Sequence, residues 1–381
     1  MKIIFLEAVQ DHGGARKSTL ELAERLQNNG AEVSVIDFYG SNTDFVEDAK
    51  SKNLQLTILS KRNSPFIIQD KNYFKYLKNI IQFFFQSRKM KKKLSDVLSG
   101  FSADFIIVNN RKTLSIIPKN NNNKIIFFAR GWFINKQIPK LDKILMKKKV
   151  DIYMAVSQST RQALYCSEMQ SLDNIHVVKN GIDLDKINQY NRPKNNIFTI
   201  VHSGGFIPDK GQQICLEIAA ELKKKQLPFK LILTGKVYEE PDSQNYYQFI
   251  KESIKKINIE KEVEIIKNRN NILDVIASAH VLIHPSSTEG LPRVLMEAMA
   301  LRTAVISNPV GGVTDFILDG YTGFLTDYNS VENYVEKLEL LQNNAELKET
   351  ITKNAFELIK TCYTANGQAE SMLKLLTTEL K

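Results

Sequence analysis

Residues 284–300, HPSSTEGLPRVLMEAMA, decide the fold of this chain. An apolar run at 279–283 stands before them and predicts a buried strand that ends at Pro285. Apolar residues at helical spacing follow the loop and predict a helix that begins near Pro292. Pro292 suits the first helical position, because a residue there donates no bond within the helix. The stretch is therefore expected to form a strand, a tight loop and the start of a helix.

This loop is expected to bind an anion flanked by hydroxyl groups. Unpaired N–H groups at a helix start favour phosphate, and Gly290 lets the backbone approach a ligand closely. Glu289 lies in the loop, whereas Glu297 lies in the helix, four residues after Arg293. Since carboxylates repel phosphate, the two are expected to accept hydrogen bonds from hydroxyl groups on either side of it. A phosphate flanked by hydroxyl groups describes a nucleotide sugar.

The composition is that of a globular protein. The chain has 381 residues, of which 43% are hydrophobic and 25% charged, which is enough for two domains with separate cores. No apolar run approaches the ~20 residues that span a bilayer, and the apolar N-terminus is too short for a signal peptide, so a cytoplasmic location is expected. The cysteines and histidines lack metal-ligand spacing, so no metal is expected. Cysteine stands at 166, 215 and 362, and histidine at 12, 176, 202, 280 and 284.

The net charge of +10 implies an anionic partner. Residues 71–93 contain eight Lys or Arg, six aromatic residues and no acid, and their apolar positions predict an amphipathic helix with a basic rim. One interpretation places this helix on an anionic membrane surface, with the protein peripheral on the inner face of the plasma membrane. The other packs its aromatic residues on a sheet. The basic run at 88–93 favours the membrane, and no nucleic-acid partner is expected, because no recognised motif for one is present.

A strand, turn, helix and second strand open the chain. Gly13 and Gly14 stand between a predicted strand at 2–9 and a helix that ends at 28–30, and the next strand is predicted at 31–37. The first turn of such a unit binds ligands in open parallel sheets. It is not a P-loop, since Arg16 stands where a glycine before Lys17 is required. Further strands are expected at 54–59, 104–108, 124–128, 151–156 and 175–178.

The pattern restarts after a polar segment at 188–196, which is predicted to be the linker between two domains. The first strand of the second half leads into a loop at 203–211 that contains Gly205 and Lys210. A final helix is expected from about residue 367 to 380. Strands are expected at 198–202, 231–235, 263–266, 281–284 and 304–307, with an edge strand at the end of 319–325.

Residues 289–300 fill the pattern Glu-Gly-Leu-Pro-x-Val-Leu-x-Glu-Ala-Met-Ala, which resembles the signature of family 4 of the retaining glycosyltransferases, enzymes of the GT-B fold. The loop at Gly13 and Gly14 is similar to the Gly-Gly loop with which this family faces the donor diphosphate. The loop at 203–211 is similar to its Gly-Arg-Leu-x-Pro-x-Lys-Gly loop, whose Arg and Lys hold that diphosphate. Lys210 is kept, but Gly205 replaces the Arg, and Arg130 stands where relatives often carry a His.

The resemblance implies an α/β chain with two Rossmann-like domains that face each other across a cleft. Residues 1–188 would bind the acceptor, 189–362 would bind the nucleotide sugar, and a helix at 363–381 would return to the first domain. Catalysis would fall to Glu289, Lys210 and Arg130, with Arg130 stabilising negative charge. Glu289 would hold the donor sugar and Glu297 the ribose. The implied donor-binding residues are Gly13, Gly14, Gly205, Lys210, Gly235, Glu289, Gly290, Leu291 and Glu297.

The implied activity is a retaining glycosyl transfer, of hexosyltransferase type, that needs neither metal nor cofactor. A UDP-, GDP- or ADP-sugar would be the donor, and a glycan or lipid-linked hydroxyl group the acceptor, in cell-surface polysaccharide biosynthesis. Two alternatives keep the fold and change the function. One is a nucleotide-sugar epimerase, and the other is a non-catalytic nucleotide-sugar-binding protein, which is favoured if the departures at Gly205 and Arg130 abolish turnover.

Overall fold

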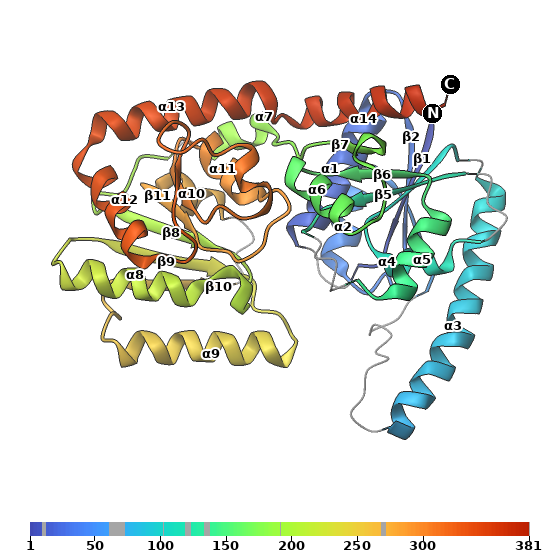
Figure 1. The fold of residues 1–381 in the computed structure, drawn as a ribbon, viewed down its shortest axis with the longest axis horizontal. Helices are drawn as coiled ribbons and strands as arrows, with labels where there is room; N and C mark the ends of the chain where they lie inside the picture. Colours follow the sequence, from blue (N-terminus) through green and yellow to red (C-terminus); the bar gives the residue numbers. More distant parts are fainter. Residues whose placement is uncertain are drawn as a thin grey trace. The chain divides into compact units, whose positions relative to one another are not determined.

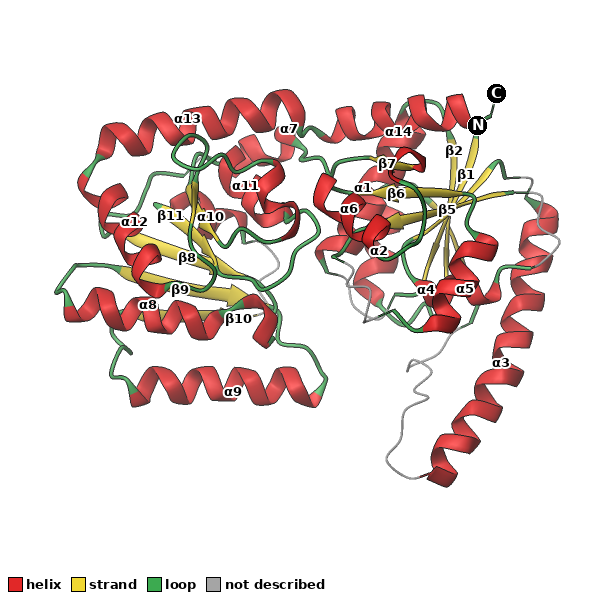
Figure 2. Cartoon of the chain, viewed as in Figure 1, coloured by secondary structure: helices red, strands yellow, loops and turns green. Residues whose placement is uncertain are grey.

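The computed structural model describes residues 1–9, 13–60, 73–101, 103–118, 123–132, 138–190, 192–267 and 272–380. These residues form two compact units (Figures 1 and 2). Unit 1 comprises Met1–Lys179 with Ala365–Lys381, and unit 2 comprises Asn180–Thr364. Each unit is built on a parallel sheet whose strands alternate with helices along the chain, so the predicted pair of Rossmann-like α/β domains is confirmed.

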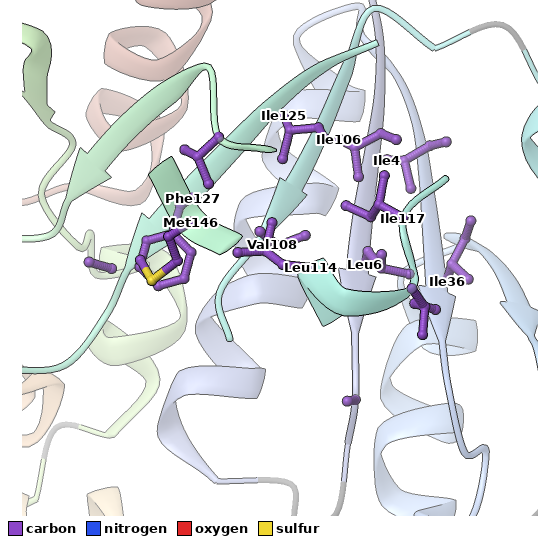
Figure 3. Packing of buried hydrophobic residues seen from close by; sticks show 14 of the residues in the cluster. Ile4, Leu6, Ile36, Ile106, Val108, Leu114, Ile117, Ile125, Phe127 and Met146 are labelled. Atoms are coloured by element: carbon purple, nitrogen blue, oxygen red, sulfur yellow. The ribbon is translucent and has the colours of Figure 1, made fainter. Parts of the chain in front are cut away.

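Unit 1 contains a seven-stranded parallel sheet in the order β3-β2-β1-β4-β5-β6-β7. Its central strands are buried on both faces, as the near-continuous apolar runs predict. Figure 3 shows part of the resulting core, in which side chains of β1, β4 and β5 pack with Leu114 and Met146 from two helices. The strands are β1 Lys2–Glu7, β2 Glu32–Asp37, β3 Gln55–Ile58, β4 Phe105–Val108, β5 Lys124–Ala129, β6 Ile152–Ala155 and β7 Ile175–Val177.

The helices of unit 1 include the last one in the chain. This helix, α14, packs against α1, so the predicted return of the C-terminal helix to the first unit is confirmed. Helix α6 is capped by Ser157, whose side chain accepts a bond from the Thr160 N–H. The helices are α1 Gly14–Asn28, α2 Thr43–Ser51, α3 Tyr73–Gly100, α4 Arg111–Ile116, α5 Lys140–Lys149, α6 Gln158–Cys166 and α14 Ala365–Glu379.

Helix α3 contains the basic and aromatic segment. Its helical structure begins at Tyr73, and residues 71 and 72 lie outside the described part of the chain. The alternative that places the aromatic side chains of this segment in a core is wrong for those that the structure describes, because Phe74, Phe84 and Phe85 are exposed. Among the described residues no helix is both long enough and apolar enough to cross a membrane.

Unit 2 contains a six-stranded parallel sheet in the order β10-β9-β8-β11-β12-β13, with the predicted edge strand at its end. The strands are β8 Thr199–Ser203, β9 Lys230–Gly235, β10 Val263–Lys267, β11 Val281–His284, β12 Ala304–Ser307 and β13 Phe324–Leu325. The helices are α7 Leu184–Ile187, α8 Gln212–Lys224, α9 Pro241–Lys256, α10 Leu273–Ser278, α11 Arg293–Ala300, α12 Val331–Asn343 and α13 Ala345–Cys362.

The boundary between the units lies at residue 179, not at the predicted 188, and the returning segment begins at 365 instead of 363. Residues after 179 belong to unit 2 because they are bonded to it. The Ile182 N–H donates to the Tyr363 carbonyl at 2.8 Å. The polar segment at 188–196 is no free linker, since Lys194 Nζ donates to the carbonyl oxygens of Ala277 and Ala279 at 3.0 and 2.7 Å. Polarity alone marked this segment, and polarity does not distinguish a linker from a bonded surface segment.

Candidate active site

All but one of the predicted donor-binding residues of unit 2 lie at or after the ends of three neighbouring strands, and the exception, Glu297, lies on α11. These strands, β9, β8 and β11, are adjacent and parallel, so their carboxyl ends meet at one edge of the sheet. Open α/β sheets bind ligands at that edge. The loop after β8 carries Gly205 and Lys210, Gly235 ends β9, and the loop after β11 carries Glu289, Gly290 and Leu291.

Two glycines allow these loops to pack backbone against backbone. A Cβ on Gly211, whose φ is +74°, would lie 2.2 Å from the carbonyl oxygen of Pro285. A Cβ on Gly235 would lie 1.8 Å from the carbonyl oxygen of Gly204. Any side chain at either position would therefore force the loops apart. The structure thus gives Gly235 a packing role, and its predicted contact with the donor stays a prediction.

The ring of Tyr238 occupies the space beside Gly205, where the family carries its arginine. A Cβ on Gly205 would lie 2.6 Å from Cε2 and 2.7 Å from the hydroxyl oxygen of Tyr238. The backbone of Tyr238 is held in place because its N–H donates to Ser243 Oγ at 3.0 Å, and Ser243 in turn donates to the Phe206 carbonyl at 2.8 Å. The ring of Tyr238 therefore fills the space that a side chain at position 205 would enter.

Glu289 is the centre of a buried polar cluster. Its Oε1 accepts a bond from Lys210 Nζ at 2.6 Å and one from His284 Nε2 at 2.8 Å, and its side chain is 11% exposed. Burial by itself would raise the pKa of Glu289, but Lys210 and His284 outweigh burial and lower it to about 2. Glu289 is therefore ionised at neutral pH. An ionised carboxylate only accepts hydrogen bonds, so His284 donates from Nε2.

A second histidine, His202, packs beside His284. The two rings are stacked with centroids 6.2 Å apart. His202 is fully buried, and its Nδ1 lies 3.2 Å from the carbonyl oxygen of Ile283, which can only accept, so Nδ1 carries the proton. Burial, and then the charge of His284, lowers the pKa of His202 to about 3, which keeps it neutral. Sequence reasoning missed both histidines, although each stands near the carboxyl end of one of two neighbouring strands.

The loop after β11 is bound to the loop after β8. Ser286 Oγ and the Ser287 N–H both donate to the Asp209 carbonyl, at 3.0 and 2.8 Å. The buried side chain of Asn308 donates to the Ser286 carbonyl at 3.1 Å from the other side. These bonds fix the backbone shortly before Lys210 and shortly before Glu289, so the pair is preorganised.

The next residues of this loop are also fixed, through their carbonyl groups. The Gly312 N–H donates to the Gly290 carbonyl, and Asn180 Nδ2 donates to the Leu291 carbonyl, each at 3.0 Å. These bonds use the carbonyl groups and not the N–H groups, which were predicted to meet the diphosphate. Helix α11 begins at Arg293, with Pro292 as its N-cap in an extended conformation, so the predicted position of Pro292 as the first helical residue is wrong by one.

Glu297 has partners different from those of Glu289. Its Oε1 lies 3.6 Å from a guanidinium nitrogen of Arg293, one turn earlier on α11. Arg293 also donates to the carbonyl oxygen of Gly181 at 3.3 Å. The structure therefore places both predicted carboxylates in unit 2, one in the loop with Lys210 and one on the helix with Arg293, and each has its own cation.

The remaining predicted site residues lie in unit 1, where the structure brings them together. Gly13 is the N-cap of α1 and Gly14 its first residue, while residues 10–12 of the loop lie outside the described part. Arg130 follows β5, and its Nη1 donates to the Ala15 carbonyl at 3.4 Å. Its guanidinium group lies 4.7 Å from the ring centroid of Phe128. Arg130 is thus placed at the start of α1, next to the glycine loop.

Glu7 was not predicted as a site residue, yet it lies beside this group at the end of β1. It accepts bonds from Asn109 Nδ2 at 2.6 Å and Thr19 Oγ1 at 3.0 Å, and Arg16 Nε lies 3.5 Å away. Burial raises the pKa of Glu7, although the charges of Arg16 and Arg130 oppose the rise. Among the described residues no three His, Cys, Asp or Glu residues form a group that could hold a metal ion.

Two family models match the chain, one on each half. The model described as Glycosyltransferase Family 4 matches residues 12–186, and the model described as Glycosyl transferases group 1 matches residues 184–358. Together they extend from residue 12 to residue 358, and the boundary between them falls close to the boundary between the two units.

Individual relatives and one solved structure agree with the two models. The chain is 26% identical over 254 residues to the capsular polysaccharide biosynthesis glycosyltransferase CapM of Staphylococcus aureus, a match that covers 63% of this chain and 65% of that one. It is 24% identical over 384 residues to the GalNAc-alpha-(1->4)-GalNAc-alpha-(1->3)-diNAcBac-PP-undecaprenol alpha-1,4-N-acetyl-D-galactosaminyltransferase of Campylobacter jejuni, covering 99% of this chain and 98% of that one.

The fold is similar to that of Anabaena HepE, crystallised with UDP-glucose, with a TM-score of 0.82, 19% identity, and coverage of 99% of this chain and 100% of that one. The residues that carry the pattern at 289–300, the two α/β units and both matching models lead to one conclusion. The chain is a glycosyltransferase of the GT-B fold and belongs to family 4, the group 1 glycosyl transferases.

Proposed function

We propose that this enzyme transfers a hexosyl group, with retention of configuration and without a metal, from a nucleoside diphosphate sugar to a hydroxyl group of a glycan or a lipid-linked acceptor in cell-surface polysaccharide biosynthesis. One observation carries the proposal. A lysine and an ionised glutamate are held 2.6 Å apart, Lys210 to Glu289, at the carboxyl edge of the unit 2 sheet.

The pair suits a donor that is charged at one end and rich in hydroxyl groups at the other. In the reaction the bond between the anomeric carbon and the diphosphate breaks, and the acceptor hydroxyl group attacks from the same face. Negative charge develops on the diphosphate while the sugar acquires oxocarbenium character. The ammonium group of Lys210 would meet the developing charge, and the carboxylate of Glu289 would accept hydrogen bonds from the sugar hydroxyl groups.

Further residues have roles in this proposal as expectations. Glu297 would accept hydrogen bonds from the ribose hydroxyl groups. The amides of Gly290 and Leu291, close to the N-terminus of α11, would add to the stabilisation of the diphosphate. Arg130, next to the glycine loop at Gly13 and Gly14, would stabilise negative charge from unit 1, since an arginine stays protonated at neutral pH. These groups would supply the positive charge that a metal gives in other enzymes.

The relatives support the donor and acceptor classes. The Campylobacter jejuni relative is named for transfer to a glycan on PP-undecaprenol, and the Staphylococcus aureus relative for capsular polysaccharide biosynthesis. Anabaena HepE was crystallised with UDP-glucose. A lipid diphosphate glycan is therefore the first acceptor class to test, and UDP-sugars are the first donors.

The test is release of nucleoside diphosphate from UDP-, GDP- and ADP-sugars, with and without a membrane lipid extract as acceptor. The proposal expects release that depends on acceptor, survives EDTA, and yields a product whose anomeric configuration by NMR equals that of the donor. Lys210→Met and Glu289→Gln should abolish most of it, whereas Lys256→Met, at an exposed lysine of α9, should not. Conversion of donor without acceptor would identify an epimerase instead.

A second candidate function is supported by Tyr238. The chain has one cation fewer at this loop than the family pattern supplies, because Gly205 replaces the arginine, and the ring of Tyr238 fills the space beside Gly205. A protein that binds nucleotide sugars without turnover would have this departure. In that case donor binding would be measurable by calorimetry, and no nucleoside diphosphate would be released with any acceptor in the extract.

A further inference from the structure

Helix α3 presents a row of large apolar side chains to solvent. Among the side chains of its first half that the structure describes, six such residues are exposed, and each is of a type that is normally buried. They recur at intervals of three, four or one residues, so most of them share one face of the helix. The exposed fractions are 81% for Phe74, 38% for Leu77, 37% for Ile80, 57% for Ile81, 52% for Phe84 and 65% for Phe85.

The second half of the same helix is anchored in the core of unit 1. Met90 and Leu94 are 6% and 1% exposed and belong to that core, and Lys93 Nζ donates to the Leu59 carbonyl at 2.9 Å. Met90 follows Ile81, and Leu94 follows Phe85, by nine residues, which at 3.6 residues per turn is about half a turn out of phase. The exposed row is therefore on the face opposite the anchored one, and the first half of α3 extends past the unit 1 sheet (Figure 1).

Cations border this row on one side and continue it along the helix, and no acid interrupts them. The helix contains no Asp or Glu before Asp96. Lys78 and Lys89 lie on one side of the apolar row, as the helical period requires, whereas Lys91 and Lys92 lie further along the helix in line with the row. Arg88 continues the row, with its guanidinium group 4.5 Å from the ring centroid of Phe84. An apolar face with a cationic rim complements a surface that is anionic outside and apolar beneath.

We propose that the exposed face of α3, defined as residues 74–92, docks on an anionic lipid bilayer. The helix would lie in the plane of the interface. Its apolar row would enter the boundary between headgroups and acyl chains, and the cations would contact lipid phosphates and anionic headgroups. This docking does not depend on the proposed transfer reaction. If both hold, docking brings the enzyme to the surface in which a lipid-linked acceptor resides.

Other occupants of this face fit less well. A second copy of the chain would bring the same cations against each other, and residues 73–95 of neither copy would offer an acid to pair with them. A nucleic acid would use the cations and the phenylalanines, but base stacking would not use Leu77, Ile80 or Ile81. A bilayer uses the aliphatic residues, the aromatic residues and the cations together.

The experiment is co-sedimentation of the full-length protein with vesicles of phosphatidylcholine alone and with vesicles that also contain phosphatidylglycerol. Two double variants change exposed residues of the face, Lys78→Glu with Lys89→Glu and Ile81→Ser with Phe85→Ser. The charge pair should lower the partition coefficient on anionic vesicles about 25-fold or more, since each cation near such a surface contributes roughly 1 kcal/mol. The apolar pair should lower it at least about tenfold.

Matched controls come from α9 and the residue that follows it in unit 2. Lys255→Glu with Lys256→Glu repeats the charge change, and Phe249→Ser with Ile257→Ser repeats the apolar change, at exposed positions. The controls should bind like the unaltered chain. Unchanged thermal unfolding confirms that each variant is folded.

Several outcomes would overturn the proposal. They are absence of binding to anionic vesicles, equal binding to both vesicle types, or equal losses in the face variants and the controls. If the protein dimerises in solution, or binds RNA more tightly than vesicles, and the two face variants lose that interaction, the face belongs to that other partner. Because sedimentation needs neither donor nor acceptor, its result is separate from the outcome of the transfer assay.

Discussion

Replacing Glu289 by glutamine removes the negative charge that Lys210 and His284 share. The pKa of Glu289 is lowered from 4.5 to about 2 in the folded protein. A difference of about 2.5 units corresponds to about 3 kcal/mol of stability, because one unit is about 1.4 kcal/mol. Because the pKa of Glu289 is lower in the folded state, its carboxylate contributes its full stabilisation when the pH is above 4.5, the pKa in the unfolded state. This contribution is lost as the pH falls towards 2, the pKa in the folded state.

The expected result is a pH-dependent difference between two proteins. At pH 7 the Glu289→Gln variant should be less stable than the unaltered chain by about 3 kcal/mol, and the difference should shrink as the pH falls from about 5 to 3. Because the chain has two units, hydrogen exchange of amides in β8 and β11 reports the stability of unit 2 directly. Glu252→Gln, at an exposed position of α9, serves as the control.

A difference that is the same at pH 7 and pH 3 would refute this account of Glu289. So would a variant that is as stable as the unaltered chain at pH 7. Either result would mean that the carboxylate is not held ionised by Lys210 and His284, and the electrostatic argument for the donor site would fail with it.

Two further predictions concern catalysis, and a third concerns donor binding. Lys210→Met should lower kcat about 10²- to 10³-fold while Lys256→Met leaves it unchanged, as for loss of one charge-stabilising group, measured by nucleoside diphosphate release. Gly205→Arg should not raise turnover, because the ring of Tyr238 occupies the space that the arginine needs. Adding Tyr238→Ala should let the arginine fit and should raise turnover. A gain in turnover in the Gly205→Arg variant alone would contradict this steric argument. Glu297→Ala should lower the affinity for a UDP-sugar, measured by calorimetry, but should not lower the affinity for its 2′-deoxy analogue, which lacks the ribose hydroxyl group. Equal losses of affinity for the two ligands would show that Glu297 does not bind the ribose.

The alternating strands and helices of the fold were predictable because their signal is local. Buried parallel strands are continuous apolar runs, so the strands predicted at 281–284 and 304–307 coincide with β11 and β12, and the other predicted strands with stated bounds match within one or two residues at their ends. The unit boundary was misplaced for the opposite reason. The hydrogen bonds of Ile182 and Lys194 within unit 2 join residues far apart in the sequence, so no local sequence pattern predicts them.

The same distinction between local and long-range signals separates the site residues that were predicted from those that were missed. The filled pattern around Glu289 and Glu297 and the kept Lys210 identified the loops, because the family preserves those residues at fixed spacing. His284 and His202 were missed, since their contact depends on strand register. The role of Tyr238 was equally invisible, because it becomes clear only when β8 and β9 bring the two loops together.

The exposure of α3 needed the structure as well. Periodicity predicts an amphipathic helix equally for a core face and a membrane face, since both need the same spacing of apolar residues. The structure separates them, because Met90 and Leu94 take the core face and Ile81 and Phe85 remain exposed.

The central claim is that Glu289 and Lys210 grip an activated sugar at opposite ends, one at the hydroxyl groups and one at the diphosphate. Isothermal titration of the unaltered chain, Glu289→Gln and Lys210→Met with a UDP-sugar and with UDP tests it directly. The account predicts that Glu289→Gln loses affinity for the UDP-sugar and keeps that for UDP, whereas Lys210→Met loses affinity for both. Equal affinity of Glu289→Gln and the unaltered chain for the UDP-sugar would contradict it.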